Sequence, residues 1–357
     1  AELITRKLIE KKPDYAKAHL NLGCILRDRG KLESAEKSVR HAIELNSDYT
    51  NAYLTLGIIL KDLGKLEQLI YLSKSTIKLR QISKGDKLNV LLNLMIADLL
   101  KEDFLGTLLN INKSKKLISQ GAIHTIKDKK VRKNSLAYYS FISSLYSQLD
   151  RQNNNKYLDK IPHIGDSHCL SFSHQTLSIN SKLEKIQPVL ITGAKAWHFA
   201  NRNNNLWKDS LIHQIRNHTY SDNIFISFGE IDCRKDEGIL NYSIKHNKNI
   251  SIICENTIID YVNYIEDKLS PIYTKRYYFG TPAPIIDLES QDDLDIKRIE
   301  MIKMYNSILK KKILSNGSFF LDVYQLTANK MGLNNGLYMC DTVHLSPRCL
   351  STLFEKY

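Results

Sequence analysis

The sequence lacks any long run of apolar residues. Within its 357 residues, no stretch approaches the roughly 18 to 20 consecutive apolar residues that a membrane-spanning helix requires. The chain also opens without the basic, apolar and small-residue segments of a signal peptide. We therefore expect no membrane span. Because the first residues already fall inside an internal repeat, we also expect the natural chain to extend upstream of Ala1.

Cysteine is scarce, and its spacing is irregular. The six cysteines form no CxxC pair, which disfavours both a zinc site and a small disulfide framework. A reducing compartment is the default, so we predict a cytoplasmic protein without a metal or cofactor. Three cysteines, Cys169, Cys233 and Cys340, lie beside the motifs described below. Packing is a simpler role for these small side chains than redox or metal chemistry.

Charge of one sign dominates, with a formal net charge of +13. Clustered cations bind phosphates, so a basic scaffold for nucleic acid is one hypothesis. The lysines, however, accompany abundant Asn and Ile along the whole chain, and no nucleic-acid motif accompanies them. We therefore expect no nucleic-acid partner, and we interpret the lysine-rich residues 113–133 as a solvated face or loop.

An internal repeat occupies the beginning of the chain. Comparison of the sequence with itself shifted by 34 residues aligns Asp14 with Asp48, Tyr15 with Tyr49, Ala18 with Ala52, Leu22 with Leu56, Gly23 with Gly57 and Gly30 with Gly64. A small residue where two helices cross and a glycine at the turn between them are typical of a helix hairpin that must stack on its neighbours.

This repeat resembles the tetratricopeptide repeat (TPR), most clearly over residues 1–80. Apolar residues at helical spacing continue in residues 88–100, 104–118 and 135–149, with a basic loop expected at 121–134. We therefore assign residues 1–150 to an α-helical TPR solenoid. The resemblance implies a protein or peptide partner; the alternative is that the helices support or dimerise the next domain.

The pattern changes after a polar linker at residues 151–158. Short apolar runs, which predict strands, alternate with longer helical stretches, of which 207–216, 252–269 and 294–314 are the clearest. The predicted strands are residues 160–164, 188–192, 223–228, 276–279 and 319–323. This alternation predicts that residues 159–357 form an α/β domain, a parallel sheet with helices on both faces and a site at the carboxyl ends of its strands.

Chemically active residue types follow these strands. Gly165-Asp166-Ser167 follows the first strand, and Asp341 and His344 lie near the end of the chain. Serine, histidine and aspartate can act as a nucleophile, a general base and the residue that orients the base. His344 lies three positions after Asp341, so one tight turn lets the carboxylate hold the imidazole while the other ring nitrogen faces Ser167.

In this second half the chain resembles the SGNH (GDSL-type) hydrolase family, whose blocks are Gly-Asp-Ser, a glycine, Gly-x-Asn-Asp and a terminal Asp-x-x-His. The resemblance implies a three-layer α/β fold with a flavodoxin-like strand order. It implies Ser167 as the nucleophile and His344 with Asp341 as the base and its orienter. It also implies that the backbone amides of Ser167 and Gly193 donate to the oxyanion.

The third block departs from the family pattern. If Gly229 aligns with the family glycine, Ile231 stands at the position of the asparagine that would be a third oxyanion donor. Loss of one such donor typically costs about 10²- to 10³-fold in rate. Arg234 is the nearest substitute donor, and Glu230 and Asp232 are candidates to bind a polar substrate. An ion pair between Asp232 and Arg234 that holds the loop is an equal alternative.

Other residues near these blocks have open roles. His163 and His168 flank the nucleophile and could line its pocket, bind a metal or serve as structural histidines. Trp197 and His198 follow Gly193 and could form an aromatic wall or belong to the core.

The sequence thus predicts an SGNH-type esterase or acyltransferase that acts on an ester-linked group, most simply acetyl, of a carbohydrate or similar polar substrate. The alternative is a catalytically degenerate, SGNH-like carbohydrate- or ligand-binding module on a TPR scaffold.

Overall fold

The computed structural model describes residues 1–151, 158–179, 181–218, 221–287, 289 and 292–355, so the predicted linker lies almost wholly outside the described residues. The chain forms two compact units. The first comprises Ala1–Tyr146 and Asn204–Ile215, and the second comprises Ser147–Asn203 and Arg216–Tyr357. The structure thus groups residues 204–215 with the helical unit, whereas the sequence pattern places them within the α/β range.

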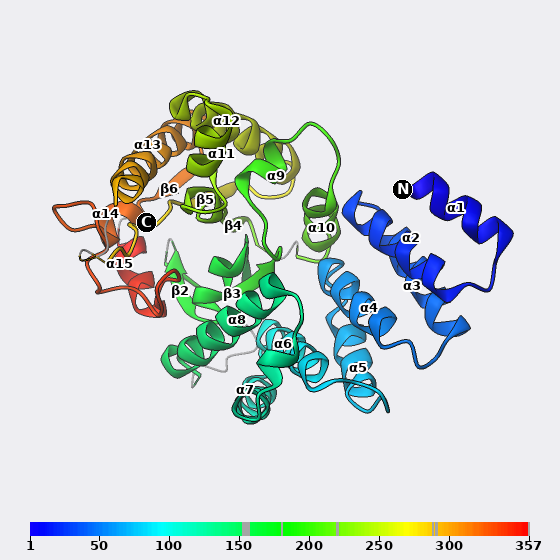
Figure 1. Ribbon diagram of the computed structural model, residues 1–357. Coiled ribbons are helices and arrows are strands. Elements are labelled where there is room, and N and C mark those ends of the chain that lie inside the picture. The colour runs from blue at the N-terminus through cyan, green and yellow to red at the C-terminus, as the bar shows by residue number, and fades with distance from the viewer. Residues whose placement is uncertain (152–157, 180, 219–220, 288, 290–291, 356–357) are drawn as a thin grey trace. The chain divides into compact units, whose positions relative to one another are not determined.

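The first unit is helical throughout (Figure 1). Its helices are α1 (Glu2–Lys11), α2 (Ala16–Asp28), α3 (Leu32–Leu45), α4 (Thr50–Asp62), α5 (Leu66–Thr76), α6 (Lys84–Leu100), α7 (Phe104–Ser119), η1 (Ala122–Thr125), α8 (Lys129–Gln148) and α10 (Leu206–Ile215). The expected loop at 121–134 is wrong in its second half, because α8 begins at Lys129. The basic residues there occupy the exposed first turns of a helix rather than a loop.

The glycines of the repeat have the expected roles. Gly30 and Gly64 adopt positive φ angles of 65° and 70° at the turns after α2 and α4. A Cβ atom on Gly23 would lie 2.3 Å from Cγ2 of Val39, so the absence of a side chain allows α2 and α3 to cross closely. One repeat later, a Cβ atom on Gly57 would make an ordinary contact at 3.6 Å.

Helix α10 joins this unit through both apolar and polar contacts. Leu206 belongs to the same buried cluster as the repeat helices. The hydroxyl of Ser210 donates to the carbonyl of Asp62 over 2.6 Å, and the backbone N–H of Leu32 donates to Asp209 over 2.9 Å. A segment far along the chain therefore caps the inter-helix turns of the repeats, which no local sequence pattern indicates.

The second unit contains a six-stranded mixed sheet in the order β2-β3-β1-β4-β5-β6. The strands are β1 (Lys160–Gly165), β2 (Thr176–Ile179), β3 (Lys182–Leu190), β4 (Asn223–Ser227), β5 (Lys275–Phe279) and β6 (Phe319–Leu321). All neighbours pair in parallel except β2, which pairs antiparallel with β3 at the edge. The sequence prediction missed β2, and it missed residues 182–187 of β3 because three of those six residues are charged.

One charged residue of β3, Glu184, is buried and has hydrogen-bond partners. Glu184 accepts hydrogen bonds from the amide of Asn223 at 2.8 Å and from Ser221 at 3.1 Å, and its side chain is almost fully buried. A buried carboxylate needs such donors. The strand therefore begins at Lys182, before this charged residue, rather than at the predicted residue 188.

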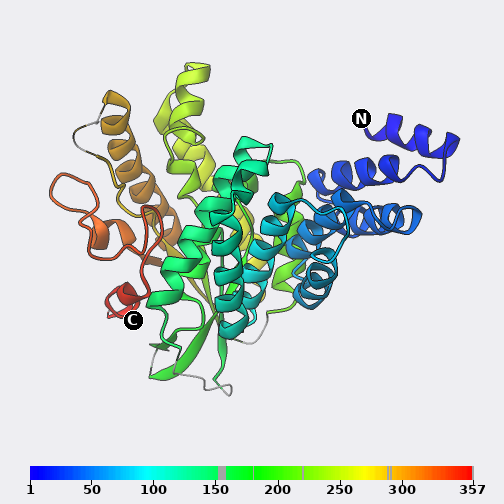
Figure 2. The ribbon, with the colours of Figure 1, turned by 60° about the horizontal axis from the view of Figure 1, so that its bottom comes forward.

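Helices cover both faces of this sheet. They include α9 (Ala196–Ala200), α11 (Ile239–His246), α12 (Ile250–Leu269), α13 (Asp293–Ser315), α14 (Val323–Thr327) and α15 (Leu350–Phe354). The long helices α12 and α13 pack against each other, yellow-green and gold in Figure 2. On β4, Phe225 meets Phe354 of α15 with ring centroids 5.0 Å apart, while the neighbours Ile224 and Ile226 are buried on the opposite face.

Among the described residues, no helix is both long enough and apolar enough to cross a membrane.

Candidate active site

The carboxyl ends of β1 and β4 approach each other closely. A Cβ atom on Gly165 would lie 2.2 Å from Oγ of Ser227, so only glycine fits at the end of β1. The next residue, Asp166, accepts a hydrogen bond from the backbone N–H of His168 at 2.9 Å and so caps the short helix η2 (Ser167–Phe172). Ser167 is therefore fixed at the first position of this helix, at the sheet edge.

Three predicted residues come together at this edge. Nε2 of His344 lies 2.8 Å from Oγ of Ser167, and Nδ1 of His344 lies 2.8 Å from Oδ2 of Asp341. The other carboxylate oxygen of Asp341 accepts from the backbone N–H groups of Val343 and His344, at 2.8 and 2.6 Å. The tight turn thus holds the carboxylate in place, and the carboxylate holds the imidazole toward the serine.

The electrostatics of this group suit a neutral base. Burial lowers the pKa of His344 below its usual value, and the nearby charge of His168 adds to this effect against the opposing bond to Asp341. Burial opposes ionisation of Asp341, but the hydrogen bond and charge of His344 lower the pKa of Asp341 overall. With Asp341 ionised, the proton of neutral His344 belongs on Nδ1, and Nε2 can accept the serine proton.

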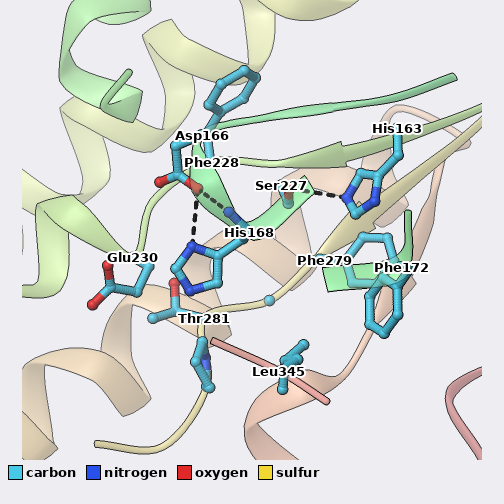
Figure 3. A pocket seen from close by; sticks show the side chains of 12 residues that line it. His163, Asp166, His168, Phe172, Ser227, Phe228, Glu230, Phe279, Thr281 and Leu345 are labelled. Atoms are coloured by element: carbon cyan, nitrogen blue, oxygen red, sulfur yellow. Dashed lines mark hydrogen bonds and ion pairs between the residues drawn. The ribbon is translucent and has the colours of Figure 1, made fainter. Parts of the chain in front are cut away.

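A second histidine and carboxylate, His168 and Asp166, are hydrogen-bonded to each other (Figure 3). Nδ1 of His168 lies 2.9 Å from Oδ1 of Asp166, and its Nε2 lies 3.2 Å from the carbonyl of Val343. The rings of His168 and His344 have centroids 4.8 Å apart. Burial disfavours the charge on His168, but Asp166 raises the pKa of His168 to about 9. His168 is therefore a cation, and its hydrogen bond to the carbonyl of Val343 holds the turn that carries Asp341 and His344.

A small cavity of about 20 Å³ extends behind His168, between Asp166, Thr281 and His163. In Figure 3, His163 lies among aromatic rings, and its Nε2 is 3.0 Å from Oγ of Ser227. Burial, with a smaller contribution from the charge of His168, lowers the pKa of His163 to about 3, so this histidine is neutral. The structure thus separates the two histidines that flank Ser167: His163 lies in the core, and His168 belongs to the site.

The two predicted oxyanion donors are available. Gly193 lies in the turn after β3 with φ of 66°, and Ser167 begins η2. Within the part of the chain that the structure describes, neither backbone N–H donates to another group. Both follow strands that run parallel, so they belong to the same edge of the sheet.

The charged residues after β4 differ from their expected pairing. Arg234 contacts Glu230 at 2.8 Å and Glu237 at 3.2 Å rather than Asp232. The carboxylate of Asp232 accepts from the backbone N–H groups of Ala196 and Trp197, at 2.7 and 3.1 Å, at the start of α9. The alternative of an Asp232–Arg234 ion pair is therefore wrong, because each residue has found another partner.

Burial affects this loop strongly. It raises the pKa of Asp232 to about 6, against the hydrogen bonds from α9. Ile231 is also buried, in the short helix η3 (Ile231–Cys233), and its aliphatic side chain cannot donate to an oxyanion. Since the guanidinium of Arg234 is bound to two carboxylates, the loop is built as a structural brace.

The sequence assigns no role to one pair of residues beside the candidate nucleophile. In the sequence, Asp166 and His168 stand out only as neighbours of Ser167, but in the structure they form a buried ion pair that contacts the backbone beside His344. The spacing Asp-x-His was the available signal, because an aspartate that caps a short helix can reach both the backbone and the ring two residues later. Within the described residues, no group of three or more His, Cys, Asp or Glu side chains could hold a metal ion.

Comparison with known proteins bears on the helical unit. Residues 16–49 match the tetratricopeptide repeat family, so the predicted repeat is confirmed there. No curated protein matches the chain. Among solved structures, one described as a "putative platelet activating factor from Streptococcus pneumonia" is 18% identical, covers 61% of this chain and 90% of that chain, and has a TM-score of 0.38.

Proposed function

We propose that the chain is an SGNH-type serine esterase or acyltransferase. Its substrate would carry an ester-linked acyl group, most simply acetyl, on a carbohydrate or a similarly polar molecule. The observation that supports this most strongly is the continuous chain of contacts Ser167–His344–Asp341, with both distances at 2.8 Å. These distances fall in the range required for a nucleophile, its base and the orienter of that base.

The geometry supports a two-step reaction. Oγ of Ser167 attacks the ester carbonyl carbon while its proton moves to Nε2 of His344, and the backbone N–H groups of Ser167 and Gly193 donate to the oxyanion. His344 then returns the proton to the departing alkoxide oxygen, which leaves an acyl-serine. In the second step, His344 takes a proton from water or a sugar hydroxyl, whose oxygen attacks the acyl carbon. The bond to Oγ of Ser167 then breaks, His344 gives the proton to Oγ, and the acyl group leaves on the attacking oxygen. Hydrolysis and transfer share every residue of the site.

The strand order gives further support. The five parallel strands β3, β1, β4, β5 and β6 lie in the order 2-1-3-4-5 of their succession along the chain. This is the flavodoxin-like order, in which a site forms where the strand order reverses, next to the first strand. Ser167 directly follows that strand.

Ile231 favours a second candidate function. With two backbone amides and no side-chain donor from this position, the oxyanion is stabilised less than in a three-donor site, by about 3 to 4 kcal/mol. A carbohydrate- or ligand-binding module with very slow turnover is therefore the alternative. It predicts glycan binding that His344→Ala leaves unchanged and no measurable ester turnover.

A fluorophosphonate probe tests the first proposal. The wild-type protein should be labelled at Ser167, and Ser167→Ala should not be. Ser171→Ala is a matched control, because Ser171 lies in the same short helix and its buried hydroxyl has no hydrogen-bond partner among the described residues. Failure to label folded wild-type protein, together with no turnover of aryl acetates, would reject the esterase in favour of the binding module.

We also propose that the repeats bind a protein or peptide partner, as the match at residues 16–49 suggests. The competing role is self-association. Light scattering across a range of concentrations separates the two, since a dimer of this chain at low micromolar concentration would favour the competing role.

A further inference from the structure

A second, larger cavity lies within the α/β unit. Its volume is about 640 Å³, and residues of α9, α11, α12 and the loop after β4 line it. Sites for small organic ligands typically measure about 300 to 1,000 Å³. The cavity's lining includes Lys195, five residues after β3 ends at Leu190, and Asp232, five residues after β4 ends at Ser227. It therefore follows the ends of β3 and β4, along the edge where Ser167 follows β1.

Large side chains remain partly exposed in this cavity. Trp197 on α9 is 49% exposed, Tyr242 on α11 is 41% exposed and Ile252 on α12 is 57% exposed. Aromatic side chains offer a rigid apolar face together with a polar edge. Sugar rings are matched to such walls, because their C–H faces are apolar while their hydroxyls need hydrogen-bond partners.

The charges that line the cavity balance. Lys195 and Lys248 supply two cations, and Asp232 and Glu237 supply two carboxylates. The ammonium of Lys195 donates to the carbonyl of Glu237 at 2.7 Å and lies 3.5 Å from its carboxylate. Burial, followed by the charge of Lys195, lowers the pKa of His198 to about 3, so this histidine adds no charge at neutral pH. The lining therefore carries little net charge to recruit an anion, and its charged groups offer polar partners beside a largely apolar surface.

The wall that carries Trp197 is fixed by the loop after β4. Asp232 accepts hydrogen bonds from the backbone N–H groups of Ala196 and Trp197, and His198 accepts one from the N–H of Lys195 at 2.9 Å. This gives the residues around Ile231 a role that an oxyanion donor would not explain. Through Asp232 they fix the position of the first turn of α9, and with it the backbone of Trp197, relative to the loop after β4.

We propose that this cavity binds an uncharged sugar unit of the substrate, with Trp197 and Tyr242 as its stacking walls. The inference rests on the proposed ester chemistry only for the identity of the reacting group. The sugar is the part of the substrate remote from the ester, and its binding energy positions the acyl group at Ser167.

The test measures sugar binding directly. Ligand-observed NMR and calorimetry would be run with methyl glycosides of glucose, galactose, mannose and N-acetylglucosamine, their β-linked disaccharides, and glucuronic acid. At least one neutral sugar should bind, and Trp197→Ala and Tyr242→Ala should each weaken it about tenfold or more, which corresponds to about 1.4 kcal/mol. Trp197→Phe, which keeps an aromatic face, should retain most of the affinity.

The chain offers a matched control. It contains two tryptophans, and Trp207 lies on α10 in the helical unit. Trp207→Phe should leave sugar binding unchanged, and it makes Trp197 the sole tryptophan, so that its fluorescence reports occupancy.

Each outcome bears on the inference. No binding by any of the sugars, preference for glucuronic acid alone, or full affinity in folded Trp197→Ala would overturn it. Ser167→Ala separates this inference from the proposed function, because it should bind sugar like the wild type while losing all labelling. Sugar binding without labelling of the wild type would reject the esterase and keep the sugar site; labelling without sugar binding would do the reverse.

Discussion

Asp341→Asn is the change that most directly tests how the base is held. One oxygen of Asp341 accepts two backbone N–H bonds, at 2.8 and 2.6 Å, and the amide oxygen of asparagine can keep both. The turn and the fold should therefore persist. The other oxygen lies 2.8 Å from Nδ1 of His344. An amide NH₂ there is a donor, so it demands that Nδ1 become an acceptor and that the proton move to Nε2.

Nε2 of His344 faces Ser167, and once this nitrogen carries a proton it cannot accept the proton of the serine hydroxyl. The same tautomer change in a serine protease lowers kcat by about 10⁴-fold. That corresponds to about 5.5 kcal/mol in activation free energy. We expect a loss of this order in kcat for an aryl acetate and in the rate of fluorophosphonate labelling. The free energy of unfolding should change by no more than about 1 kcal/mol, because the hydrogen bonds of the turn survive.

The control is Asp322→Asn. Asp322 also caps a helix, with the N–H of Gln325 at 3.1 Å, and it pairs with Lys310 on the surface. It should retain full activity. If folded Asp341→Asn keeps more than about a tenth of the wild-type kcat, the role given to Asp341 is refuted, since the wrong tautomer leaves only the catalysis of the oxyanion site and binding.

Three further predictions follow from the structure. The pKa of His344 lies below its usual value, so activity should fall on acidification with a midpoint below pH 6.5, and His168→Gln, which removes a neighbouring cation, should move that midpoint upward in a pH–rate profile. The pKa of His168 is about 9 in the folded protein and about 6.5 in the unfolded chain, so charged His168 stabilises the fold fully below pH 6.5, and this stabilisation is lost as the pH rises through 9. The free energy of unfolding in urea should therefore fall by up to about 3 kcal/mol over this range, and His168→Gln should not show this fall. In the repeats, Gly23→Ala should lower the free energy of unfolding by about 1 to 3 kcal/mol, because the new Cβ would lie 2.3 Å from Val39, and Val39→Ala should partly restore it. Gly57→Ala should be neutral or stabilising by up to about 1 kcal/mol, since its Cβ has room. Equal effects at the two glycines, measured by circular dichroism in urea, would contradict this packing.

The helical region was largely predictable because its signals are local or strictly periodic. A repeat of 34 residues and glycines at the crossings and turns determine the helix hairpins before any tertiary contact is known. The start of α8 escaped prediction because its first turns are basic and exposed, and apolar spacing cannot mark a helix there.

The strands were predictable only where they are apolar. Buried runs such as β1, β4 and β5 stand out, whereas the charged first half of β3 hides its strand, because Glu184 is satisfied by residues near β4. Placement of α10 with the repeats depends on bonds to Leu32 and Asp62, far away in the sequence.

By itself, the sequence determined which residues are available for chemistry. Ser167 shortly after the strand that ends at Gly165, and His344 three positions after Asp341, can be read directly from the sequence. The backbone hydrogen bonds of a single turn are enough to hold Asp341 beside His344. The tertiary structure decided which residues are in contact. It brought Ser167 to within 2.8 Å of His344, 177 residues later in the chain. It also paired Arg234 with Glu230, and it placed Asp232 where it accepts hydrogen bonds from the first turn of α9. The reason is physical, since a buried charge takes whichever partner the fold brings nearest, and sequence spacing does not encode that choice.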